Sequence, residues 1–156
     1  MAVTNERVRA ILDLDEPDYD AAAAELGSEA LPILRRFVEG GDANRAAKAA
    51  YLAGLIGDPA AADILEFAAT SADPGVRAAA ASGAGHLGTK AESVLMTLVD
   101  DADPAVRKVA LRAVPAQPGK ELLAKVRVLR DAEPEPMVRE LAAELVERTS
   151  RADPSG

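Results

Sequence analysis

The segment Asp103-Pro-Ala-Val-Arg107 occurs in two further forms, as Asp73-Pro-Gly-Val-Arg77 and, with glutamate in place of aspartate, as Glu135-Pro-Met-Val-Arg139. The three starts are 30 and 32 residues apart. A fourth, degenerate copy begins at Asp42, where Ala46 stands in the place of the arginine. Four recurrences at a nearly constant spacing indicate a protein built from one repeated structural unit.

Each copy begins with the residues that start a helix. Asp73 and Asp103 are favourable N-caps, because a carboxylate accepts hydrogen bonds from the free backbone N–H groups of the first turn. The proline that follows takes the first helical position, where its missing N–H costs nothing. Apolar residues then recur at helical spacing, as in Val106, Ala110 and Val114. A second set of helices is expected between the copies, over 28–40, 59–70, 90–100 and 119–131, and a further pair over 4–13 and 18–27.

These helices predict an all-α fold, a right-handed α-solenoid (α-α superhelix) of about five antiparallel helix pairs. One pair cannot bury its apolar face alone, so each pair must cover the next. The 35 alanines of the chain suit such stacking, because small side chains let helices approach closely. We expect a single domain over 1–149, with a capping pair at 1–27 and a disordered tail at 150–156. Its repeats are expected at 28–57, 58–88, 89–116 and 119–149.

The pattern Asp-Pro-x-Val-Arg-x-x-Ala-Ala, followed by Gly-x-Leu-Gly, resembles the short HEAT repeats of bacterial and phycobilin-lyase-like proteins. The match is best at 58–88 and 89–116, whereas 1–27 matches only as a helical pair. The resemblance implies a solenoid that serves as a recognition surface. It also implies that the repeat arginines are structural and pair with an acid of a nearby turn, such as Asp101 or Glu133. The structural repeat positions are then Asp73, Arg77, Asp103, Arg107 and Arg139.

The composition excludes several kinds of site. The chain has no cysteine, so disulfides and thiolate metal sites are absent. Its start is polar and no apolar run could cross a bilayer, which favours a cytoplasmic protein without a membrane segment. His86 is the only histidine, whereas the deoxyhypusine hydroxylases that share this scaffold need several His-Glu motifs. We therefore expect no catalytic residue, no metal and no cofactor, and we interpret the acids from Asp13 to Asp20 as a solvated turn.

Candidate binding residues follow from the repeat register. In HEAT-like pairs the helix that starts with Asp-Pro lines the concave side of the solenoid. Solvent-facing positions on that side fall one, five and nine residues after the repeat arginine. Tyrosine and arginine are common anchors of protein interfaces. The candidates are Tyr51, Ser82, His86, Lys108 and Arg112.

Charge separates the remaining alternatives. The chain carries a net charge of −8, yet segment 107–130 has seven bases against one acid. The main hypothesis is a non-enzymatic scaffold or adaptor that binds a protein segment on its concave face. The alternative is an enzyme or enzyme accessory that resembles the phycobilin lyases. Nucleic-acid binding through 107–130 is the weakest hypothesis, because this segment has no aromatic residue for base stacking.

Overall fold

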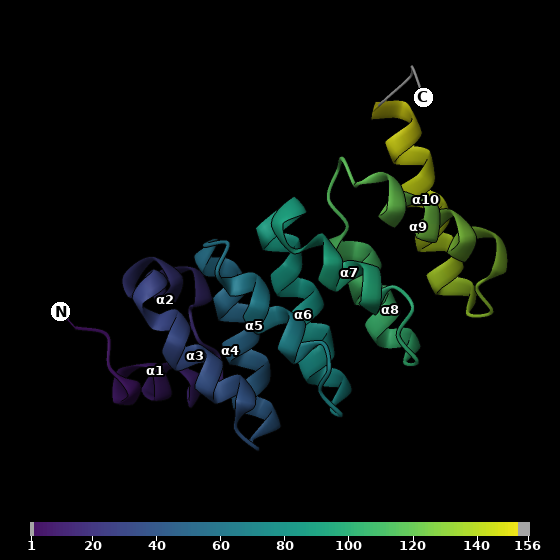
Figure 1. Ribbon diagram of the computed structural model, residues 1–156. Coiled ribbons are helices and arrows are strands. Elements are labelled where there is room, and N and C mark those ends of the chain that lie inside the picture. Colours follow the sequence, from purple (N-terminus) through teal and green to yellow (C-terminus); the bar gives the residue numbers. More distant parts are fainter. Residues whose placement is uncertain (1, 153–156) are drawn as a thin grey trace.

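The computed structural model describes residues 2–152, and all regular structure in that range is helical. The last eight helices form four antiparallel pairs that stack in chain order after the first two helices, with the N-terminus at one end of the stack and the C-terminus at the other (Figure 1). The all-α solenoid expected from the repeats is confirmed. Its α-helices are α1 (Asn5–Leu12), α2 (Tyr19–Leu26), α3 (Leu31–Glu39), α4 (Ala43–Ile56), α5 (Ala61–Ala68), α6 (Pro74–Leu87), α7 (Glu92–Leu98), α8 (Pro104–Ala113), α9 (Lys120–Ala132) and α10 (Pro136–Ala152). Short 3-10 turns at Ser28–Ala30 and Gly88–Ala91 precede α3 and α7.

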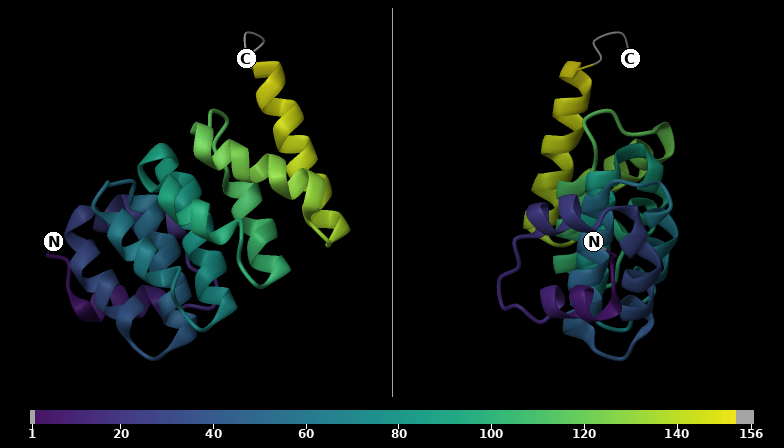
Figure 2. Two further views of the ribbon diagram at one scale, coloured as in Figure 1. Left: turned by 45° about the vertical axis from the view of Figure 1, so that its right-hand side comes forward. Right: turned by 90° about the vertical axis from the view of Figure 1, so that its left-hand side faces the viewer.

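The pairs stack through two rows of helices. The even-numbered helices α2, α4, α6, α8 and α10 pack on one another in one row, and α3, α5, α7 and α9 do so in the other. Contact is closest between α4 and α6. Two turned views follow the stack along its length and from its N-terminal end (Figure 2). We refer to the surface of the first row as the even-helix face.

The helix starts form as the repeat predicts. The Asp73 carboxylate accepts hydrogen bonds from the N–H groups of Gly75 at 2.8 Å and Val76 at 3.1 Å. The Asp103 carboxylate accepts one from Ala105 at 2.8 Å. Proline follows each aspartate at the first helical position. The same short sequence therefore fixes where α6 and α8 begin, and with that the register of their outward faces.

Two glycines bring α4 and α6 together. Gly54 and Gly83 face each other so closely that a Cβ atom added to Gly54 would lie 2.6 Å from the carbonyl carbon of Gly83. A Cβ added to Gly85 would lie 3.1 Å from the Cβ of Ala113, at the next interface, between α6 and α8. Small residues thus set the helix spacing along the even row, and side chains near these crossings come within reach of one another.

The end of the domain differs from the prediction. The tail expected at 150–156 is wrong for Ser150, Arg151 and Ala152, because α10 continues to Ala152. The Ser150 hydroxyl donates to the Val146 carbonyl at 2.9 Å, and Arg151 pairs with Glu147 one turn earlier. Residues 153–156 of the expected tail lie outside the described residues. Across residues 2–152, none of the helices combines the length and apolar character that crossing a bilayer requires.

Candidate functional site

A hollow of about 570 Å³ lies on the even-helix face. Tyr51 comes from α4, Ser82 and His86 from α6, and Arg112 from α8. The remaining wall is mostly apolar and includes the segment after α8. The lining residues are Tyr51, Ser82, Gly85, His86, Val109, Arg112, Ala113, Val114 and Pro115.

The repeat register brings these polar groups together. Tyr51, Ser82 and Arg112 each lie five residues after the repeat arginine or its substitute, and so hold one equivalent position in three successive repeats. His86 lies one helical turn beyond Ser82 on the same face of α6. The structure therefore places four of the five predicted residues, Tyr51, Ser82, His86 and Arg112, around a single hollow.

Lys108, the fifth predicted residue, does not line the hollow. Its Nζ atom lies 3.9 Å from the Sδ atom of Met137, which belongs to α10. The lysine is one helical turn before Arg112 on α8 and its long side chain extends toward the next pair instead. Repeat counting fixes the face from which a side chain leaves, but it does not fix the direction of a flexible lysine.

An aromatic row runs into the hollow from the N-terminal end. The rings of Tyr51 and His86 meet edge to face, with centroids 5.6 Å apart. The Tyr51 hydroxyl oxygen lies 3.5 Å from Nε2 of His86. Tyr19 of α2 meets Tyr51 in the same way, with centroids 4.9 Å apart. Burial raises the pKa of the Tyr19 hydroxyl, with a smaller contribution from Tyr51. Such edge-to-face contacts hold the rings in place and favour a rigid surface.

Sequence reasoning missed Tyr19. Segment 1–27 carries no copy of the repeat motif, so no register was available to place its side chains. The available signal was composition, because Tyr19 and Tyr51 are the only tyrosines in the chain. In the structure α2 packs beside α4 and so extends the even-helix face by one helix.

Arg112 is the charged group of the hollow. Its side chain is exposed, and within residues 2–152 it forms no ion pair and no hydrogen bond. The hollow thus offers a guanidinium, an imidazole, two hydroxyl groups and an apolar wall. Such a surface can hold an anion through Arg112 while apolar or aromatic groups lie against Tyr51 and Pro115.

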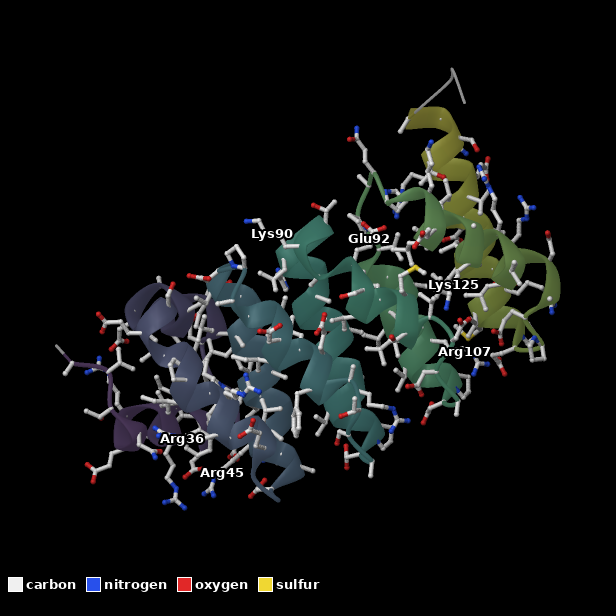
Figure 3. All side chains as sticks on the ribbon, in the orientation of Figure 1. Arg36, Arg45, Lys90, Glu92, Arg107 and Lys125 are labelled. Atoms are coloured by element: carbon white, nitrogen blue, oxygen red, sulfur yellow. The ribbon has the colours of Figure 1, made fainter. Side chains whose placement is uncertain are left out.

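The other bases of segment 107–130 are less available than their number suggests. Arg107 binds Glu133, Lys125 binds Asp100 and Arg130 binds its neighbour Asp131. Figure 3 labels Arg107 and Lys125 on this part of the solenoid. Three of the seven bases are therefore paired with acids that lie outside the segment. Two of these pairs, those of Arg107 and Lys125, join a helix to a loop, which weakens the case for a phosphate-binding surface.

Two of the structural arginines take the ion pairs that the resemblance implies. Arg77 binds both carboxylate oxygens of Asp101, with Nε to Oδ2 at 2.8 Å and Nη2 to Oδ1 at 3.0 Å. Arg107 binds Glu133 in the same two-pronged way, at 3.0 Å and 2.6 Å. Burial alone would raise the pKa of the Glu133 carboxyl. The Arg107 hydrogen bonds and the N–H of Glu135 outweigh burial, so its pKa is lowered.

Two of the acids from Asp13 to Asp20 have structural partners. Asp13 binds Arg45 of α4 at 2.6 Å, and this hydrogen bond lowers the pKa of the Asp13 carboxyl. Asp18 caps α2 by accepting the N–H of Ala21. Over residues 2–152, no three acidic or histidine side chains are grouped as a metal ion would require. The cluster thus joins α4 to the first pair and starts α2.

The stacked pairs, the aspartate-proline helix starts and the inter-repeat ion pairs define an α-solenoid repeat protein. A sequence profile of HEAT repeats matches residues 64–147, more than half of the chain, and the chain belongs to this family. Matching solved structures include the complex of CpcE and CpcF of phycocyanin lyase from Nostoc sp. PCC7120. That match has a TM-score of 0.73 and 23% sequence identity, and it covers 90% of this chain and 96% of the other. No curated protein matches the sequence.

Proposed function

We propose that this protein is a non-enzymatic interaction module that binds a segment of a partner protein on its even-helix face, the concave side of the solenoid. The observation that carries the proposal is the convergence of Tyr51, Ser82 and Arg112, from equivalent positions of three repeats, on one hollow. Solenoids use such faces, with one contribution from each repeat, to bind extended ligands. The solved relative is described as a complex of two proteins, which agrees with a role in protein association.

The hollow indicates the chemistry of the bound segment. Arg112 lacks an acid of its own within residues 2–152, so an aspartate, glutamate or terminal carboxylate of the partner would supply the missing charge. Tyr51 and His86 already hold each other and would present their rings with little loss of side-chain freedom. Lys108 would act at the edge of the site as a second positive charge. The expected ligand is therefore an acidic segment with an apolar or aromatic neighbour.

The experiment is an affinity purification with the intact chain as bait. Lys108→Glu/Arg112→Glu should greatly reduce partner recovery, because both positive charges at the site are reversed. The matched control is Lys120→Glu/Arg127→Glu, which changes the net charge equally at two exposed bases outside the hollow. Tyr51→Ala tests the aromatic part without any change in charge. Equal recovery with the site and control variants, at unchanged helical content, would refute this site.

A second candidate is a role in bilin handling like that of a phycocyanin lyase. The likeness to the solved CpcE–CpcF complex, over nearly the full length of both chains, favours it. The hollow also has the volume of a small-molecule site. In this case Arg112 would pair with a carboxylate of the ligand. Incubation with phycocyanobilin, followed by absorbance spectroscopy, distinguishes the two candidates. A spectral shift that Arg112→Gln abolishes supports bilin binding, and an unchanged spectrum excludes it.

A further inference from the structure

The repeat arginines form a ladder that joins each pair to the next. The guanidinium of Arg77 binds both its own turn and an acid of the next turn. Its Nη1 donates to the Ser71 carbonyl of its own turn at 2.9 Å, whereas Nε and Nη2 bind Asp101, 24 residues ahead. Arg107 repeats this arrangement, with Nη1 on the Asp101 carbonyl at 2.9 Å and the other two nitrogens on Glu133, 26 residues ahead. One rung of the ladder is thus an arginine held by its own turn and an acid supplied by the next turn.

The acid of each rung is fixed in place as well. One carboxylate oxygen of Asp101 accepts the N–H of Asp103 at 2.9 Å, and Glu133 accepts that of Glu135 at 3.1 Å. The acid side chains are 7% and 2% exposed, and those of the two arginines are 18% and 13% exposed. Both partners are therefore positioned by their own turns and covered when the pairs stack.

Arg139 is the start of a third rung. Its Nη1 donates to the Glu133 carbonyl at 2.8 Å, the bond that also positions Arg77 and Arg107. Its Nε and Nη2 atoms, however, have no acceptor within residues 2–152, and its side chain is exposed. One nitrogen of the guanidinium is thus held by its own turn, as in the two preceding rungs, at the C-terminal end of the described solenoid.

At the N-terminal end of the ladder, both the arginine and the acid of the rung are replaced by uncharged residues. Ala46 stands in the arginine position of the first repeat, and Ser71 stands in the position of the acid that would bind it. The Ser71 hydroxyl still accepts the N–H of Asp73 at 3.2 Å, so the turn is kept while both charges are absent. Arginine and acid are lost together there, whereas Arg139 is present without an acid among residues 2–152.

We propose that Arg139 is the docking point for an acidic turn of another polypeptide, stacked on α9 and α10 as a further helix pair. The partner would supply an aspartate or glutamate in the turn ahead of a helix, and both of its carboxylate oxygens would bind Nε and Nη2 of Arg139. A second copy of this chain is a poor occupant, because Asp101 and Glu133, its acids at this position, already bind Arg77 and Arg107. The occupant that we propose is an acidic turn of a different helical-repeat protein. This proposal is independent of the hollow on the even-helix face.

The first test uses the intact chain alone. Arg107→Met and Arg139→Met remove the same side chain from a closed and an open rung, and unfolding in urea is followed by circular dichroism. Arg107→Met should shift the midpoint to lower urea, whereas Arg139→Met, which loses only the bond to the Glu133 carbonyl, should shift it far less. An equal shift for both variants would show that the third rung is already closed, and would overturn the proposal.

The second test supplies the missing acid. A second copy of residues 119–152 is appended after Ser150, which puts the copied Glu133 26 residues beyond Arg139, the spacing of the Arg107–Glu133 pair. Arg139→Met should now lower the urea midpoint, and a Gln at the copied glutamate should remove that difference. If Arg139→Met has no more effect in the extended chain than in the original one, Arg139 cannot serve as a rung.

The third test identifies the occupant. A photo-crosslinking amino acid is placed at Glu140, next to Arg139, in cells that produce the protein. The expected result is a crosslink to an acidic turn of another helical-repeat chain, lost in Arg139→Met. Dimers crosslinked between identical chains would assign the site to self-association instead. Crosslinks that persist in Arg139→Met, or an absence of any crosslink, would overturn docking at this end.

Discussion

Gly54→Ala should weaken the solenoid, although alanine is the better helix former. The added Cβ would lie 2.6 Å from the Gly83 carbonyl carbon and closer still to two other backbone atoms of Gly83, against 3.4 Å or more for an ordinary contact. These neighbours are backbone, so no side chain can rotate away and α4 must move from α6 by about 1 Å. Overpacking of this kind costs about 1–3 kcal/mol, and here the upper end applies. The gain of about 1 kcal/mol in helix propensity offsets part of it.

The net loss in free energy of unfolding is therefore about 2 kcal/mol, which lowers the Tm of a domain of this size by about 4–8 °C. Thermal and urea unfolding monitored by circular dichroism measure it. Gly41→Ala is the matched control, because an added Cβ there meets no atom within 4 Å. It should leave stability unchanged or raise it by up to about 1 kcal/mol. A Gly54→Ala protein as stable as the wild type would show that the small residues do not set the helix spacing.

Three other perturbations test the ion pairs and the caps. Arg107→Met should lower the free energy of unfolding by about 3 kcal/mol, because the buried Glu133 carboxylate loses its partner. Arg130→Met removes an exposed pair and should lower it far less in the same urea titration. The pKa values of the Asp101 and Glu133 carboxyls are lowered, so the folded state binds protons less readily than the unfolded state. The stability that these two ionised carboxylates contribute is therefore complete above their ordinary pKa values of 3.8 and 4.5. It is lost as the pH falls through the lowered pKa values. Urea midpoints measured between pH 7 and pH 3 should show this decline in stability. The control is the Asp101→Asn/Glu133→Gln protein, which should be less stable at neutral pH and should show a smaller decline. Asp103→Ala removes the cap of α8 and should cost about 1 kcal/mol by thermal unfolding, whereas Asp103→Asn should retain most of the stability.

The repeat motif made most of the fold predictable. Asp73 and Asp103 mark helix starts through a local interaction, so their positions also fix the register of α6 and α8. From that register follows the shared position of Tyr51, Ser82 and Arg112. Local chemistry repeated at a constant spacing is therefore sufficient to predict which residues share a face.

What the motif could not predict depends on contacts between units. Lys108 occupies the expected helix position, but its flexible side chain extends to Met137 of the next pair. Tyr19 lies in a segment without the motif, so only the stacking of α2 on α4 brings it to Tyr51. Helix α10 continues past Ser150, whose hydroxyl donates to the Val146 carbonyl, and a helix pattern read from apolar residues does not reveal this continuation.

The charge of this chain has a different meaning in three dimensions than along the sequence. Counted along the sequence, segment 107–130 is the basic part of an acidic protein. In three dimensions Arg107 and Lys125 bind acids that belong to other segments, and their charge holds the stack together. A solenoid joins its repeats through charged side chains, so the charges available for recognition are those that stacking leaves unpaired. Among the bases that have no acidic partner within residues 2–152, Arg112, in the hollow, and Arg139, at the end of the ladder, are the two at which we propose that a partner's carboxylate binds.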